Sequence, residues 1–129
     1  MEKKIKSFKD LEIWKRSIGL VKEIYQISET FPKAELYGLT NQLRRAAISI
    51  PSNIAEGHTR RHTKEFRQFL YVALGSLAEV ETLLTLAVEL KCVHQDKILP
   101  PQREIEELGK MINALLAKLK SRTQDYTDP

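Results

Sequence analysis

Apolar residues recur at three- and four-residue steps in four segments of the chain, with polar residues between them. This spacing places the apolar side chains on one face of a helix. The four segments lie between about residues 10 and 31, 35 and 56, 64 and 91, and 101 and 120. Because the connections are short, consecutive helices run antiparallel. We therefore expect an all-α protein, folded as an up-down-up-down antiparallel four-helix bundle.

The whole chain, residues 1–129, is expected to form a single four-helix bundle domain. Residues 1–7 form a basic arm ahead of the first helix, and Ser7 and Asp10 have the spacing of a capping box, so either can cap that helix. Residues 121–129 are polar, and we expect them to form a mobile tail.

The first helix carries two apolar stripes, which together are wider than one contact within a bundle requires. One flank can remain exposed and meet another copy of the protein. Alternatively, the helix lies in a groove between two others and is covered on both sides. The sequence leaves both alternatives open. The first stripe is Leu11, Trp14, Ile18, Val21 and Tyr25, and the second is Ile13, Leu20, Ile24, Ile27 and Phe31.

The second helix contains Pro51 within its apolar pattern. A proline has no N–H for the carbonyl four residues earlier, here Ala47, and its ring crowds that carbonyl. We therefore expect a proline kink in this helix, with no chemistry of its own. The nearby side chains that can bond the freed backbone groups are Ser49, Ser52 and Asn53.

Glycine and proline also mark the other helix boundaries. Gly57 is expected to end the second helix in the left-handed conformation, and Gly75 to allow a close crossing in the third. Pro100 and Pro101 are expected to break any helix before them, with Pro101 in the first turn of the fourth helix.

Composition limits the classes of function. The chain has a formal net charge of +4 and a pI near 9.2, which permits a polyanionic partner without requiring one. A single cysteine, Cys92, excludes an internal disulfide framework and is consistent with a reducing compartment. The charged N-terminus is followed by no long apolar run, so we expect a cytoplasmic protein with neither signal peptide nor membrane span.

Few side chains have the spacing of a catalytic or metal site. His58 and His62 are four residues apart, but two arginines lie between them, so we interpret them as solvated turn residues. The sequence indicates no enzyme, no cofactor and no metal. The carboxylates near the predicted core faces are Glu56, Glu79 and Glu81, for which Arg45 is a candidate structural partner.

Basic residues are the remaining functional signal. They gather around the turn between the second and third helices, with two more about three helical turns earlier and two in the N-terminal arm. Such residues neutralise phosphates without reading sequence, but they are also typical of an ordinary solvated face. The candidate nucleic-acid-binding residues are Arg44, Arg45, Arg60, Arg61, Lys64, Arg67, Lys3 and Lys4.

Three segments together resemble a known family. They are residues 8–14 (FKDLEIW), residues 43–57 (LRRAAISIPSNIAEG) and residues 66–79. They are similar to the bacterial four-helix-bundle proteins encoded by intervening sequences in 23S ribosomal RNA genes, the S23 family. The resemblance extends from about Phe8 to Leu119, and the segment around Pro51 is its most specific part.

The resemblance implies a four-helix bundle that assembles into homopentameric rings and has no enzymatic activity. It also implies a relation to the accessory variability proteins of diversity-generating retroelements, which are basic pentamers that bind nucleic acid and a reverse transcriptase. The positions that the resemblance marks as a structural signature, as determinants of fold and packing, are Arg45, Pro51, Asn53, Glu56, Gly57 and Glu79.

Two hypotheses of function follow. In the first, a homo-oligomer binds structured RNA, or DNA, through basic surface patches. In the second, the oligomer is a scaffold for a protein partner, such as a reverse transcriptase or a ribosomal component, and binds no nucleic acid directly.

Overall fold

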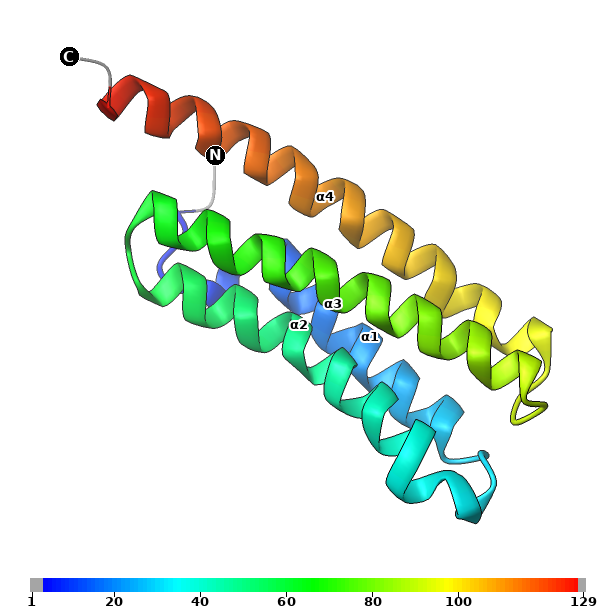
Figure 1. Ribbon diagram of the computed structural model, residues 1–129. Coiled ribbons are helices and arrows are strands. Elements are labelled where there is room, and N and C mark those ends of the chain that lie inside the picture. Colours follow the sequence, from blue (N-terminus) through cyan, green and yellow to red (C-terminus); the bar gives the residue numbers. More distant parts are fainter. Residues whose placement is uncertain (1–3, 128–129) are drawn as a thin grey trace.

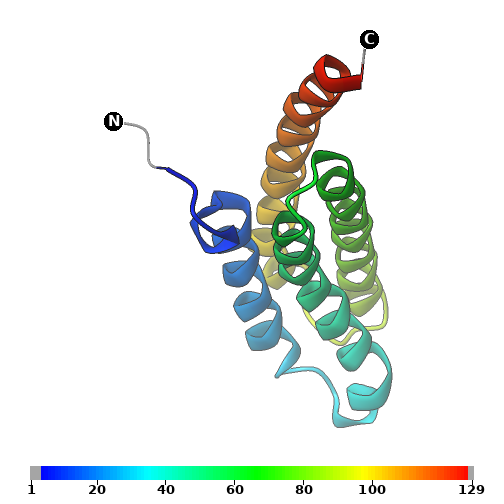
Figure 2. The same cartoon turned by 90° about the vertical axis from the view of Figure 1, so that its left-hand side faces the viewer.

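The computed structural model describes the backbone of residues 4–127 and the side chains of residues 4–121. Over these residues the regular secondary structure is all helical, joined by short turns (Figure 1). Helix α1 contacts α2 and α4, and α3 contacts the same two helices, so the four form an antiparallel bundle (Figure 2). The prediction of an all-α four-helix bundle is confirmed. The elements are η1 (Phe8–Asp10), α1 (Glu12–Ser28), η2 (Lys33–Glu35), η3 (Leu36–Thr40), α2 (Asn41–Thr59), α3 (Thr63–Glu89) and α4 (Gln95–Thr127).

A capping box precedes the first helical turn. The Ser7 hydroxyl accepts a hydrogen bond from the Lys9 N–H (3.2 Å), and the Asp10 carboxylate accepts one from the Ser7 N–H (3.1 Å). The box was predicted from its spacing. It caps the short 3-10 turn η1 rather than α1, which begins two residues after that turn.

The two apolar stripes of α1 differ in how far the chain covers them. The second stripe is the buried one, with Leu20 and Ile24 almost inaccessible. The first stripe is half-buried as far as Val21, and only Tyr25 is more exposed, at 39%. The structure therefore favours the alternative in which the first helix lies between two neighbours, here α2 and α4.

Helix α2 continues through Pro51 without a break, and Pro51 itself is buried. Two of the predicted side chains bond backbone carbonyls beside Ala47. The Asn53 amide donates to the Ser49 carbonyl (2.7 Å), and the Ser49 hydroxyl donates to the Ala46 carbonyl (2.8 Å). Neither bond reaches the Ala47 carbonyl itself, which lacks its usual donor because residue 51 is proline. Side-chain bonds of this kind often bend a helix. The kink itself stays a prediction.

The roles predicted for Gly57 and Gly75 were wrong. Gly57 lies inside α2, and the residue with positive φ after that helix is Arg61, at 59°. A Cβ atom placed on Gly57 would lie 2.6 Å from Cβ of Phe69, so it is here that α2 and α3 approach closely. At Gly75 the same test finds nothing within 4 Å. Close packing against Phe69, rather than a left-handed helix end, explains why residue 57 is a glycine.

Helix α4 begins at Gln95, so the expected break at Pro100 and Pro101 was also wrong. Pro100 and Pro101 lack the backbone N–H groups that would otherwise have bonded the carbonyls of Asp96 and Lys97. Those two residues are exposed, so water can reach them. Ile98 and Pro101 are buried, and their packing fixes these first turns. At its other end the helix extends beyond the predicted limit at Lys120 to Thr127.

An ion pair joins α1 to α4. The Arg16 guanidinium donates to both carboxylate oxygens of Glu104, at 2.7 and 2.8 Å. Burial, and secondarily the charge of Glu104, raises the pKa of the neighbouring Glu23 carboxyl. Because a raised carboxyl pKa in the folded state means that ionisation opposes folding, the charge of Glu23 destabilises the bundle as the pH rises through that pKa.

Candidate nucleic-acid interface

Positive charge gathers at one end of the bundle. The start of α1, the turn from α2 to α3 and the C-terminal part of α4 lie together there (Figures 1 and 2). We call this region the basic end, defined by its described cations. The acidic residues near it are fewer: Asp10, Glu12, Glu56 and Glu65. The cations are Lys4, Lys6, Lys9, Arg60, Arg61, Lys64, Arg67, Lys118 and Lys120.

The opposite end of the bundle is close to neutral. It holds the connection from α1 to α2 and the turn from α3 to α4 (Figure 1). Charges of both signs alternate there, so no single-sign field is produced. The charged residues of these two connections and their edges are Glu29, Lys33, Glu35, Glu89, Lys91, Asp96 and Lys97. The molecule is therefore electrically polar along the bundle.

The predicted cations of the basic end differ in how tightly they are held. Arg60 forms an ion pair with Glu56 (3.3 Å), and its guanidinium lies 5.3 Å from the ring centre of Phe69. Arg61 and Lys64 are exposed, and neither has an ion pair within the described part of the chain. These two side chains are thus the most available for an external anion.

Arg67 and the N-terminal lysines complete the predicted set at this end. Arg67 is half-buried, and its Nε atom is inaccessible and without a hydrogen-bond partner among the described residues. Lys4 is exposed, whereas Lys3 lies outside the described residues. Lys6, Lys118 and Lys120 were not among the predicted candidates. The antiparallel order of the helices could have identified them, because it brings α4's last turns to the N-terminal end of α1.

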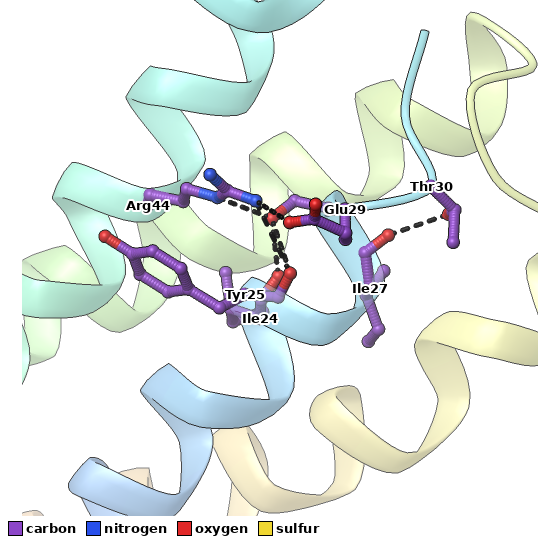
Figure 3. Close-up of polar contacts among 7 residues, drawn as sticks. Ile24, Tyr25, Ile27, Glu29, Thr30 and Arg44 are labelled. Atoms are coloured by element: carbon purple, nitrogen blue, oxygen red, sulfur yellow. Dashed lines mark hydrogen bonds and ion pairs between the residues drawn. The ribbon is translucent and has the colours of Figure 1, made fainter.

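Arg44 does not belong to the basic end. Its Nε donates to the Ser28 hydroxyl (2.8 Å), a terminal nitrogen pairs with Glu29 (3.2 Å), and the guanidinium lies 4.5 Å from the Tyr25 ring centre (Figure 3). The side chain is only 18% exposed. These contacts join α2 to α1, so Arg44 has a structural role and is unavailable to a nucleic acid.

Arg45 points elsewhere because one helical residue turns the side chain by about 100°. It is exposed beside α3, in a groove with Glu79 and Tyr37. The expected pairing of Arg45 with a buried glutamate was wrong, since Glu56, Glu79 and Glu81 are all exposed. Arg45 lies roughly 22 Å along α2 from Arg60, at 1.5 Å per residue, and so is also separate from the basic end.

The six signature positions divide into two groups. Pro51 and Gly57 are buried, and the Asn53 side chain bonds the backbone of its own helix. These three are packing positions. Arg45, Glu56 and Glu79 lie at the surface.

The two histidines differ in their surroundings, since His58 is half-buried and His62 is exposed. The His58 ring meets Phe66 edge-on at 5.5 Å, and His62 immediately precedes α3. Within residues 4–121, no group of three or more histidine, cysteine or acidic side chains is placed to hold a metal ion. Burial raises the pKa of the Cys92 thiol, which lowers the thiolate fraction at neutral pH.

An apolar surface on α3 was missed by sequence reasoning. Besides its buried stripe, α3 exposes Tyr71 (54%), Val72 (52%) and Leu86 (44%), and Leu90 (60%) follows directly after the helix. The signal was available, since α3 is long and apolar enough to cross a membrane by length and composition alone, a test that core helices of bundles also pass. Exposed apolar residues that adjoin one another, as Tyr71 adjoins Val72 and Leu86 lies one turn from Leu90, mark a candidate contact with a partner.

Comparison with known proteins gives a match to one family model, matches among solved structures and one negative result. The family model described as "23S rRNA-intervening sequence protein" matches residues 9–114. A solved structure of a protein of unknown function from the S23 ribosomal protein family of Bacteroides thetaiotaomicron is similar in fold. Its TM-score is 0.74 at 18% identity, over 81% of this chain and 97% of that chain. A comparison with curated proteins finds no match.

Proposed function

The chain belongs to the family of 23S rRNA-intervening sequence proteins, and from this premise we propose that it is a non-enzymatic homo-oligomer, a pentamer, that binds structured RNA through its basic end. The observation that carries the proposal is the gathering of lysines and arginines at one end of the bundle, with near neutrality at the other. Membership of this family by itself assigns no activity to the chain.

Electrostatics explains how such an end binds RNA. Each lysine or arginine that meets a phosphate releases condensed counterions, and this release drives binding without reading the sequence. Arg61, Lys64 and Lys6 are exposed on long side chains that can follow an irregular backbone. Duplex RNA offers phosphates and a defined shape rather than readable base edges in its deep groove. A surface of this kind therefore suits structured RNA.

Oligomerisation would multiply a weak interaction. The uncovered apolar residues of α3 support a contact between subunits. In a closed ring with the helices along the symmetry axis, every copy of the basic end would lie on the same face. Several modest patches on one RNA then act together, because later contacts occur at high effective concentration.

A salt titration of RNA binding tests the proposal. We expect the logarithm of the binding constant for a structured RNA to fall linearly with the logarithm of salt concentration, by about 0.7–0.9 per phosphate contact. Light scattering of the same sample should give a mass several times the 14.9 kDa chain. Absence of binding at low salt, binding insensitive to salt, or a monomer would contradict the proposal.

The exposed apolar surface of α3 also favours the second candidate function, a scaffold for a protein partner. In that case no RNA would bind at low salt, and the oligomer would retain a reverse transcriptase or a ribosomal component on purification. The two functions therefore differ in the outcome of one titration.

A further inference from the structure

A small polar groove lies between α2 and α3, on the other half of the molecule from the basic end. We call it the Tyr37 groove. Its volume, about 530 Å³, is within the range of sites that hold one small ligand. It is lined by Tyr37, Gly38, Asn41, Gln42, Arg45, Ala46, Ser49 and Glu79.

Tyr37 is the first unusual feature of this groove. Its side chain is 89% exposed, more than that of any other large apolar residue in the described chain. It lies on the π-helical turn η3, ahead of α2. Single π turns are rare and are frequent at functional sites. An aromatic ring held at the edge of a polar groove offers a flat face for stacking.

Arg45 is the second unusual feature of the Tyr37 groove. The side chain of its neighbour Arg44 is bound by Ser28, Glu29 and Tyr25. The side chain of Arg45 has neither an ion pair nor a hydrogen bond among the described residues. It lines the groove with its guanidinium available for an anion. A guanidinium is suited to a phosphate because it donates two parallel hydrogen bonds.

Glu79 is the third. Its one hydrogen bond within the described residues comes from the Gln42 amide at 3.4 Å, which is long for such a bond. The carboxylate therefore retains acceptors for a donor that enters the groove. Asn41 and Gln42 add amides that can both donate and accept. Below them, the hydroxyls of Ser49 and Ser76 are hydrogen-bonded to each other.

A flat aromatic face, an unpaired guanidinium and a carboxylate with spare acceptor positions lie within one small groove, and together they match the parts of a nucleotide. We propose that the Tyr37 groove binds one unpaired nucleotide of RNA. The base stacks on Tyr37, as unpaired bases do on aromatic side chains. Arg45 binds the phosphate, and Glu79 accepts a hydrogen bond from the base amino group, as carboxylates do from cytosine N4. This assignment deepens the proposed RNA-binding function and rests on it.

The lining distinguishes this groove from a protein interface. The core of a protein interface is depleted of charge and takes its contacts from about 20–30 residues a side. Here one aromatic ring is surrounded by two opposite charges and two amides in a space for a single small ligand. The apolar surface of α3 has the features of a subunit contact, and this groove does not.

Two RNAs of matched length and phosphate number test the assignment. One is a blunt duplex, and the other is a shorter duplex with an unpaired cytidine overhang. We expect the protein to bind the overhang RNA about tenfold more tightly, a typical gain for one stacked base. The substitution Tyr37→Ala should abolish this preference, and Tyr37→Phe should keep it. Glu79→Gln should reduce the preference for a cytidine over a uridine overhang.

Leu99→Ala provides the control, because Leu99 is an exposed apolar residue of α4 that lies outside both the groove and the apolar surface of α3. It should leave the ratio of the two affinities unchanged. If the wild type binds both RNAs equally, the groove assignment is wrong while the proposed function stands. If neither RNA binds, the proposed function itself fails. If Tyr37→Ala instead changes the subunit number in light scattering, Tyr37 is a subunit contact and the assignment is overturned.

Discussion

Replacing Arg60, Arg61 and Lys64 with alanine together is expected to weaken binding of structured RNA by roughly two to three orders of magnitude at 0.1 M salt. These cations lie at the basic end, and Arg61 and Lys64 have no ion pair within the described chain. Each lost phosphate contact removes its share of counterion release, so the salt slope should also become shallower by up to about 2.7. Filter binding over a salt series measures both quantities.

A second triple variant separates position from net charge. Lys33, Lys97 and Arg103 are exposed cations away from the basic end, and changing them to alanine removes the same formal charge. We expect this variant to lose only a small part of the affinity, through the weaker long-range field. Equal losses in the two triple variants would mean that total charge, rather than one end of the bundle, controls binding.

The substitution Gly57→Ala is expected to destabilise the bundle by about 1–3 kcal/mol, the usual range for overpacking. The new Cβ atom would lie 2.6 Å from Cβ of Phe69 and 3.1 Å from a ring carbon of Phe66. Because Cβ of Phe69 is attached directly to the backbone, relief requires α2 and α3 to separate. Urea unfolding at a fixed protein concentration measures the loss, since subunit association also contributes to stability.

Gly75→Ala is the control with the opposite expected sign. Nothing lies within 4 Å of a Cβ placed there. Alanine should therefore stabilise α3 by about 1 kcal/mol through helix propensity alone. If both alanine variants are more stable than the wild type, then α2 and α3 are not in close contact at Gly57.

Much of the fold could be predicted because the apolar spacing of each helix directly reflects its buried face. In the second helix, for example, Leu43, Ile50 and Ile54 recur at steps of seven and four residues, and all three are buried. Individual boundary residues were harder. Gly57 and Pro101 have the residue types of helix ends, but their positions are decided by Phe69 across a helix contact and by burial beside Ile98. Tertiary packing of this kind has no local signal.

The candidate site was partly predictable for the same reason. Arg60, Arg61 and Lys64 are close in sequence, so one turn brings them together. Arg44 and Arg45 are also adjacent, yet one is tied to Tyr25 and the other lies open in the Tyr37 groove. Their difference depends on which helices neighbour α2 on each side. That arrangement became visible only in three dimensions.

Lysine acetylation with and without bound RNA, followed by mass spectrometry, tests most directly whether one end of the bundle holds the RNA. All the lysines compared are exposed in the structure. We expect a blunt duplex RNA, which offers the Tyr37 groove no unpaired nucleotide, to protect Lys6, Lys64, Lys118 and Lys120 and to leave Lys33, Lys97 and Lys110 as reactive as before. Equal protection at both ends, or protection confined to Lys33 and Lys97, would contradict a basic end that binds RNA.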